Sequence, residues 1–232
     1  MGKKQAVVLL SGGIDSATCL LIAKENNYLP YCLTFNYKQR HAAEIKASKR
    51  IAKTYGAYEH KIIKIDLFRI SHSVLISDEE VPKDRDVFNI KEIPPTYVPA
   101  RNTIFLSLAL GWAETIGADD IFIGVNSIDY SGYPDCRPAY IKKFEELANL
   151  ATKAGVEGKL NFKIHAPLIN LSKAEIIRLA NEKGLDFSIT HSCYDPSPEG
   201  IACGRCDSCL LRLKGFKEAG INDPIRYASL IY

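Results

Sequence analysis

The sequence predicts an α/β fold with a doubly wound, mostly parallel sheet, and three observations indicate it. Apolar runs of strand length alternate along the chain with longer helical patterns. Polar or glycine-rich segments follow several of these runs, at the ends where parallel sheets bind ligands. The length of 232 residues suits one such domain with a small addition. We expect an α/β domain over residues 1–188 and a small helical C-terminal segment, residues 189–232, packed on it.

Charge and hydropathy exclude several other classes of protein. The net charge of +3 is too small to indicate nucleic-acid binding by itself. No apolar run approaches the roughly 20 residues that cross a bilayer. The basic residues at positions 3 and 4 precede an apolar run that is too short for a signal peptide and continues directly into a glycine turn. We therefore expect a cytoplasmic protein without a nucleic-acid or membrane partner.

The first strand, residues 6–10, is followed by the turn Ser-Gly-Gly-Ile-Asp-Ser at residues 11–16 and by a buried helix over residues 17–24. Backbone N–H groups at such a helix start are unpaired, and the helix dipole adds partial positive charge. Two glycines let the backbone approach a phosphate closely, and two serines add donors. The predicted ATP-binding residues are Leu10, Ser11, Gly12, Gly13, Ile14, Asp15, Ser16, Ala17 and Thr18.

A simple tight turn, with Asp15 or Ser16 as helix N-cap, is the alternative. A cap needs one polar residue, whereas this turn carries three around its glycines. It lacks the Lys-Ser/Thr of a Walker A loop and the spacing of a dinucleotide fingerprint. The turn resembles the S-G-G-x-D-S loop of the N-type ATP pyrophosphatases, or PP-loop enzymes, and this resemblance implies cleavage of ATP between its α- and β-phosphates.

Residues 29–35 and 60–66 read as the second and third strands, separated by a polar stretch at 36–41 and a helix that ends near residue 55. Residues 67–99 then lose all periodicity, and their charges are interspersed with Pro82, Pro94 and Pro95. A long irregular segment in a compact domain is typical of a lid or a binding loop. We expect that role here.

A helix predicted from residue 101 to about 115 begins with Arg101 and Asn102. A cation in the first turn gains nothing from the helix dipole, so Arg101 indicates an anionic ligand nearby, although an exposed arginine would fit equally. The fourth strand, residues 120–125, leads into a loop at 126–138 that is rich in carboxylates and tyrosines. Such groups suit a flat polar heterocycle and its carboxylate.

Residues 139–154 are predicted to form one helix, with Leu147 on its apolar face, and residues 162–166 to form the fifth strand. Ser172 and Glu175 then have capping-box spacing, which fixes the start of a further helix. Lys173, beside this start, either reaches an ATP phosphate or lies on a solvated helix face.

Four of the seven cysteines crowd near the C-terminus: Cys193, Cys203, Cys206 and Cys209. An odd total without a secretory signal disfavours disulfides. Four thiolates on glycine- and proline-containing loops predict a structural Zn²⁺ site, and an iron–sulfur cluster is the alternative.

The whole chain resembles the 7-cyano-7-deazaguanine synthase family of queuosine biosynthesis. The matching stretches are residues 11–16, Gln-Arg-His at 39–41, Pro-Ala-Arg-Asn at 99–102, residues 124–137 with Gly-Tyr-Pro-Asp-Cys-Arg, and the four cysteines. The resemblance implies an adenine nucleotide α-hydrolase-like fold, a homodimer, and an ATP-dependent ligase. Its implied reaction joins ammonia to 7-carboxy-7-deazaguanine and forms the nitrile through an adenylated carboxylate and an amide.

This resemblance suggests roles for the candidate residues. Asp15, working through Mg²⁺, and the cations Arg101 and Lys173 are the predicted catalytic groups. Cys136 is disfavoured as a nucleophile because adenylation already supplies the electrophile. The predicted substrate-binding residues are Arg101, Asn102, Asp129, Tyr133, Asp135 and Arg137.

Two other functions fit parts of the sequence. A tRNA-thiolating PP-loop enzyme would use the cysteines for catalysis or for iron–sulfur binding, but the chain has no evident nucleic-acid module. A nucleotide-binding regulatory module would need fewer polar groups at strand ends.

Overall fold

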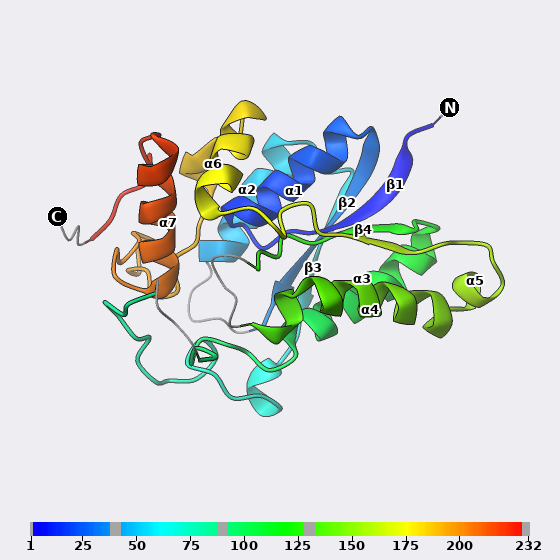
Figure 1. The fold of residues 1–232 in the computed structure, drawn as a ribbon, viewed down its shortest axis with the longest axis horizontal. Helices are drawn as coiled ribbons and strands as arrows, with labels where there is room; N and C mark the ends of the chain where they lie inside the picture. The colour runs from blue at the N-terminus through cyan, green and yellow to red at the C-terminus, as the bar shows by residue number, and fades with distance from the viewer. Residues whose placement is uncertain (1, 38–42, 88–91, 128–132, 229–232) are drawn as a thin grey trace.

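A five-stranded, entirely parallel sheet forms the centre of the molecule, as the sequence predicts (Figure 1). The computed structural model describes residues 2–37, 43–87, 92–127 and 133–228. The strand order is β3-β2-β1-β4-β5. The strands are β1 (Lys4–Leu9), β2 (Tyr28–Asn36), β3 (Glu59–Lys64), β4 (Asp120–Phe122) and β5 (Lys163–His165).

Helices cover both faces of this sheet. Figure 1 shows α1, α2 and α6 on one face and α3 with α4 on the other. None of the helices in the described part of the chain has the length and hydrophobicity that crossing a membrane requires. The helices are α1 (Ile14–Glu25), α2 (Ala43–Thr54), α3 (Arg101–Ile116), α4 (Pro138–Ala151), α5 (Lys153–Val156), α6 (Lys173–Glu182) and α7 (Asp207–Ala219), with the short 3₁₀ turns η1 (Leu67–Arg69), η2 (Pro134–Cys136) and η3 (Phe187–Ile189).

The central strand β1 is buried on both faces, and its side chains divide between two hydrophobic cores. Ala6 and Val8 pack in the core formed with α1, α2 and α6, whereas Val7 and Leu9 pack in the core formed with α3 and α4. Side chains of a strand point alternately to opposite faces, so a continuous apolar run is what a central parallel strand needs.

The strand order reverses between β1 and β4. From β1 the chain adds β2 and β3 on one side, and β4 and β5 extend the sheet on the other. Ligands of open α/β sheets bind at such a reversal, beyond the carboxyl ends of the strands. The turn at 11–16 follows β1, and residues 123–127 follow β4, so both lie at this point.

Strand β4 ends at Phe122, and the predicted extent to residue 125 is wrong. A side chain on Gly124 would place its Cβ 2.9 Å from the backbone carbon of Asp15 and the nitrogen of Ser16. The chain therefore leaves the sheet here in order to pass against the start of α1. That constraint comes from a helix more than a hundred residues away, and it leaves no periodic signal.

The single helix predicted over residues 139–154 is two helices. Thr152 between α4 and α5 has extended backbone angles (φ −113°, ψ 147°), and its Oγ1 accepts a hydrogen bond from the N–H of Gly155 at 3.2 Å. A threonine that caps a new helix ends the previous one. Leu147, which we expected on the apolar face, is half exposed.

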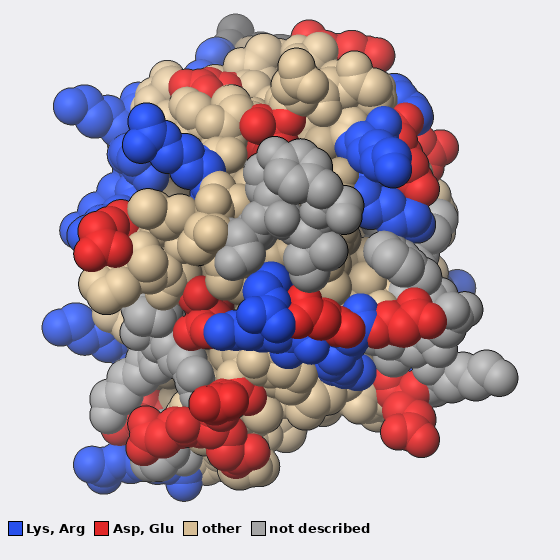
Figure 2. All heavy atoms as spheres, turned by 90° about the vertical axis from the view of Figure 1, so that its left-hand side faces the viewer, with Lys and Arg blue, Asp and Glu red and all other residues tan. Residues whose placement is uncertain are grey.

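The segment 67–99 is irregular, as predicted, and its middle part is attached to the C-terminal segment. The N–H of Asp84 donates to the carbonyl of Arg205 at 2.9 Å. Ion pairs join Lys83 to Asp195 at 3.0 Å and Arg85 to Asp207 at 3.1 Å. Figure 2 shows positive and negative side chains interleaved on the face of the molecule that includes α7. The division of the chain at residue 188 stays a prediction.

Asp120, at the start of β4, gives the fold an acid-sensitive ion pair. Its oxygens lie 2.5 Å from His165 Nε2 and 2.5 Å from Lys4 Nζ. Burial alone would raise the pKa of this carboxyl, but the hydrogen bonds from His165 and Lys4 outweigh burial and lower the pKa to about 2. The folded-state pKa thus lies below the unfolded value of about 3.9. The resulting stabilisation is present above about pH 4 and is lost as the pH falls towards 2.

We therefore expect Asp120→Asn to lower the free energy of unfolding at pH 7 by roughly 2–3 kcal/mol. Urea unfolding across the acid range measures this, and the difference from the wild type should narrow below about pH 4. Asp119→Asn is the control, because Asp119 also pairs with Lys4, at 3.0 Å, but is more exposed. Asp119→Asn should lower the free energy of unfolding by less than about 1 kcal/mol. A pH-independent loss in Asp120→Asn would contradict the assignment.

Candidate active site

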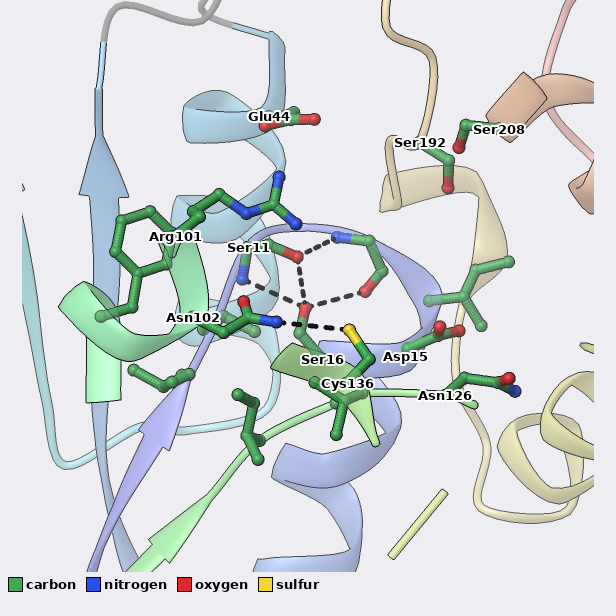
Figure 3. Close-up of a pocket in the computed structure, with 18 of the residues that line it drawn as sticks. Ser11, Asp15, Ser16, Glu44, Arg101, Asn102, Asn126, Cys136, Ser192 and Ser208 are labelled. Atoms are coloured by element: carbon green, nitrogen blue, oxygen red, sulfur yellow. Dashed lines mark hydrogen bonds between the residues drawn. The ribbon is translucent and has the colours of Figure 1, made fainter. Parts of the chain in front are cut away.

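The candidate active site is a pocket of about 270 Å³ at the reversal of strand order. Its walls come from the turn after β1, the residues after β4, the end of β2, the starts of α2, α3 and α6, a segment around residue 192, and α7. Figure 3 shows these segments converging around the turn at 11–16. The first turns of several helices, among them α1, α3 and α6, line the pocket, so positive ends of helix dipoles face it.

Hydrogen bonds within the turn fix its shape. Ser16 Oγ donates to the carbonyl of Gly13 at 3.1 Å and accepts from the N–H of Ser11 at the same distance. The two serine hydroxyls lie 3.0 Å apart, and the N–H of Gly13 donates to Ser11 Oγ at 3.3 Å (Figure 3). The helix α1 begins after Gly13, and no side chain caps it. The interpretation of Asp15 or Ser16 as N-cap is therefore wrong.

Most of the predicted ATP-binding residues line the pocket, and three do not. Gly12 adopts φ +99°, and a Cβ there would lie 2.5 Å from the carbonyl oxygen of Glu44, so this glycine lets the turn pass against α2. Ala17 and Thr18 are fully buried, and the Thr18 hydroxyl donates to the carbonyl of Ile14 at 2.8 Å. The residues of the predicted set that line the pocket are Leu10, Ser11, Gly13, Ile14, Asp15 and Ser16.

Lys173 and Asp15 form an ion pair within the pocket. Lys173 Nζ lies 2.7 Å from each carboxylate oxygen of Asp15, across 158 positions of sequence. Ser172 and Glu175 form the predicted capping box, which fixes the start of α6 and therefore the origin of the lysine side chain. Lys173 has only 18% of its side chain exposed, so it does not lie on a solvated helix face.

Arg101 and Asn102, at the start of α3, also line the pocket. Arg101 interacts with Tyr37, whose pKa is raised to about 12 by burial first and by Glu44 second, with Arg101 opposing both. Tyr37 therefore remains a neutral phenol at neutral pH. Arg101 brings a second positive charge to the pocket lining, and the first turn of α3 contains no acidic residue.

The predicted substrate carboxylate Asp135 is instead engaged by α3. Its Oδ2 accepts from the backbone N–H of Asn102 at 2.9 Å, and Asn102 Nδ2 donates to the Asp135 carbonyl at 3.1 Å. Free N–H groups at a helix start attract a carboxylate, and Ala100 at the N-cap has no side chain that would serve. Asp135 is buried outside the pocket lining, and Arg137 is exposed at the start of α4. Tyr133 lines the pocket, whereas Asp129 and the Gln-Arg-His stretch at 39–41 lie outside the described residues.

Cys136 lines the pocket as a thiol. Asn102 Nδ2 donates to its sulfur at 3.3 Å (Figure 3). Burial, and next the neighbouring Asp135, raise the pKa of Cys136 to about 12. A nucleophilic cysteine needs the opposite shift, so this environment agrees with the expectation that Cys136 is not the nucleophile.

One wall of the pocket is aromatic, and the sequence patterns did not predict it. The rings of Phe35 and Phe105 stack at 4.0 Å with an angle of 13° between their planes, and both line the pocket. Phe105 lies one helical turn after Arg101, a spacing that would have placed it on the same helix face. His191 and Arg212 also line the pocket, and no motif in the sequence marks them.

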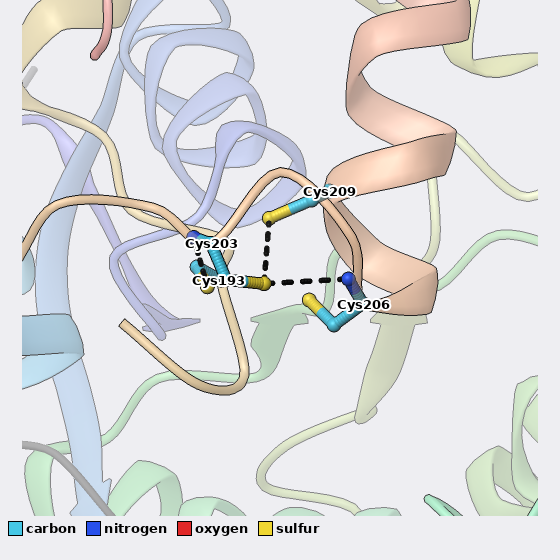
Figure 4. A group of neighbouring side chains, drawn as sticks. All are labelled: Cys193, Cys203, Cys206 and Cys209. Carbon is cyan, nitrogen blue, oxygen red and sulfur yellow. Dashed lines mark hydrogen bonds between the residues drawn. The ribbon is translucent and has the colours of Figure 1, made fainter. Parts of the chain in front are cut away.

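The four C-terminal cysteines converge on one point, ahead of and within the first turn of α7 (Figure 4). Their Sγ atoms all lie within 4.8 Å of one another, with Cys203 and Cys209 at 3.9 Å. Four sulfurs at about 2.3 Å from a single zinc ion would be about 3.8 Å apart. Backbone N–H groups donate to the sulfurs of Cys193 and Cys203 at 3.2 to 3.4 Å. The donor set therefore fits one tetrahedral metal ion.

The parallel sheet, with a Ser-Gly-Gly-x-Asp-Ser turn at its reversal point, defines a PP-loop protein of the ATP-using α/β class. More specifically, the chain belongs to the family described as queuosine biosynthesis protein QueC, whose model matches residues 5–220.

Two relatives with high sequence identity agree with this assignment. A 7-cyano-7-deazaguanine synthase from Syntrophotalea carbinolica is 62% identical over 225 residues, which cover 97% of each chain. Another from Geobacter metallireducens is 60% identical and covers 98% of this chain and 94% of its own. Among solved structures, an NH3-dependent NAD synthetase from Campylobacter jejuni aligns with 19% identity and a TM-score of 0.46, covering 82% of this chain and 68% of that one.

Proposed function

We propose that this protein is an ATP-dependent ligase that converts 7-carboxy-7-deazaguanine and ammonia to 7-cyano-7-deazaguanine. The observation that carries this proposal is the identity of about 60% to several 7-cyano-7-deazaguanine synthases over nearly the whole of each chain. A tRNA-thiolating activity has no comparable support.

The chemistry needs activation of a poor electrophile. A substrate carboxylate oxygen attacks the α-phosphorus of ATP, and pyrophosphate leaves. Ammonia then adds to the acyl carbon, AMP leaves, and a proton is lost to give the amide. A second activation at the amide oxygen, followed by loss of AMP and two protons, gives the nitrile. Such steps depend on orientation, charge stabilisation and exclusion of water, and they need no side-chain nucleophile.

The residues around the turn at 11–16 suit the ATP phosphates. The first turn of α1 presents unpaired N–H groups, and Ser11 adds a hydroxyl. Lys173 and Arg101 both bring positive charge to the pocket, which would stabilise the charge that develops on pyrophosphate as it leaves. Asp15 offers carboxylate oxygens, the ligands that Mg²⁺ prefers, and Mg²⁺ bound with ATP neutralises phosphate charge.

The aromatic wall and the start of α3 suit the deazapurine. Phe105 and Tyr133 offer ring faces and Asn102 an amide, all at the pocket surface. Asp135 contributes indirectly, because it orients Asn102 through two hydrogen bonds. Asp129 stays a proposed substrate ligand, and the exposed Arg137 is not proposed as one.

The four cysteines are proposed to hold a structural Zn²⁺, since a four-iron cluster would need its thiolates farther apart than the observed sulfurs. The metal would stabilise a loop segment that has little core of its own. The homodimer stays a prediction of the resemblance.

A product assay tests the proposed function. The protein is incubated with ATP, Mg²⁺, ammonia and 7-carboxy-7-deazaguanine, and the products are identified by mass spectrometry. We expect the nitrile, AMP and pyrophosphate, and none of these when the deazaguanine is omitted. A parallel incubation with unmodified tRNA should give no thiolated nucleoside. Turnover that requires tRNA, without any nitrile, would refute the proposal.

A further inference from the structure

A glycine in the interior of α7 lies against the active-site lysine. A Cβ built on Gly215 would be 2.4 Å from Lys173 Cγ, 3.0 Å from Lys173 Cβ and 2.9 Å from Ile177 Cδ1. Non-bonded carbon atoms meet favourably only at about 3.5–4.0 Å. Glycine also weakens a helix interior relative to alanine, so its presence here calls for a reason other than helix stability.

The missing side chain lets α6 and α7 approach closely. The two helices lie side by side in Figure 1. The aliphatic stem of Lys173 crosses the backbone of α7 at Gly215, and its ammonium reaches Asp15 at 2.7 Å. The crowded atom is Cγ, near the root of the side chain. An added methyl group could therefore be accommodated only by rotating the lysine or by separating the helices, and each of these changes moves the ammonium.

We propose that Gly215 is a positioning residue that directs the ammonium of Lys173 towards Asp15 and the bound nucleotide. This inference rests on the proposed function only in treating Lys173 as an ATP-binding group. The helix that carries Gly215 also carries Cys209, six residues earlier and about 9 Å along its axis. One helix thus connects the cysteine cluster to the placement of the lysine.

The chain contains a matched control for the substitution. Gly111 lies in the interior of α3, and a Cβ there would meet no atom within 4 Å. Alanine at Gly111 should therefore raise the melting temperature slightly through helix propensity and leave ATP binding unchanged. Gly215→Ala makes the same chemical change in a helix interior, so only the contact with Lys173 and Ile177 distinguishes the two positions.

A double-mutant cycle tests the proposal. The four proteins are the wild type, Gly215→Ala, Lys173→Ala and the double variant. ATP affinity is measured by equilibrium dialysis with labelled ATP and Mg²⁺, and kcat/KM is measured in the nitrile assay. We expect Gly215→Ala to weaken both by at least about tenfold in the wild-type background and by less than about twofold in the Lys173→Ala background, where Cγ is absent. Metal content should be unchanged.

Equal losses in the two backgrounds would overturn the proposal, because they would show that Gly215 does not act through Lys173. Unchanged ATP affinity and kcat/KM in Gly215→Ala would overturn it as well. If Gly215→Ala fails to fold, the double variant is made with Ile177→Val as well, which removes Cδ1, the other atom that a Cβ would crowd. This protein should recover folding and the ATP affinity of Lys173→Ala, and its failure to fold would count against the proposal. Dialysis needs no deazaguanine, so a wild type that binds ATP but forms no nitrile would refute the proposed function and leave this test intact.

Discussion

Asp15→Asn is expected to lower the turnover of ATP by at least about 100-fold, with the fold and the metal content retained. Asp15 projects from the first turn of α1 into the pocket, and both of its oxygens lie 2.7 Å from Lys173 Nζ. The amide keeps the size of the side chain but removes its negative charge and one acceptor oxygen. The lysine then loses its counterion, and the proposed Mg²⁺ of the ATP complex would lose an oxygen ligand. Steady-state kinetics with pyrophosphate release measure the effect.

The matched control is Glu25→Gln. Glu25 and Lys183 form a second ion pair between α1 and the end of α6, and 54% of the Glu25 side chain is exposed. This substitution makes the same chemical change at the other end of the same two helices, far from the turn at 11–16. Surface pairs contribute less than about 1 kcal/mol, so stability and turnover should hardly change. Near-normal turnover in Asp15→Asn would mean that the carboxylate serves only to hold Lys173.

Local patterns predicted the part of the fold that depends on local physics. The apolar runs, the glycine turn at 11–16 and the capping box at Ser172 each specify their own backbone, and the structure has each of them. The contact between Asp15 and Lys173 could also have been predicted from the sequence, because both residues follow strands of one parallel sheet. Carboxyl ends of such strands share one edge.

Sequence patterns do not show which partner a side chain contacts when elements far apart in the sequence pack together. The carboxylates of the 126–138 loop were all plausible substrate ligands, yet the N–H of Asn102 engages Asp135 because α3 begins without a capping side chain of its own. The end of β4 at Phe122 and the glycine at position 215 have the same origin. In each case a close approach between segments far apart in sequence determines the local structure. Such approaches leave no periodic pattern in the sequence.

Cys206→Ser is expected to abolish stoichiometric metal binding and to lower the melting temperature by about 10–20 °C. Cys206 is fully buried at the N-cap of α7, and its sulfur lies within 4.8 Å of the other three. Loss of one thiolate leaves three ligands and a poorly supported segment, because residues 193–206 contribute few apolar side chains to the cores. Elemental analysis of protein purified without added metal should give about one zinc per wild-type chain.

Cys19→Ser is the matched control for this substitution. Cys19 is also fully buried but lies in α1, away from the cluster, where a serine hydroxyl can donate to the carbonyl four residues earlier. It should retain zinc and lose only a few degrees of melting temperature. Because Cys209 and Gly215 share α7, Cys206→Ser should also weaken ATP binding, although the cluster is not part of the pocket lining. Stoichiometric iron with acid-labile sulfide in the wild type would refute the zinc assignment, and unchanged metal content in Cys206→Ser would refute the role of Cys206 as a ligand.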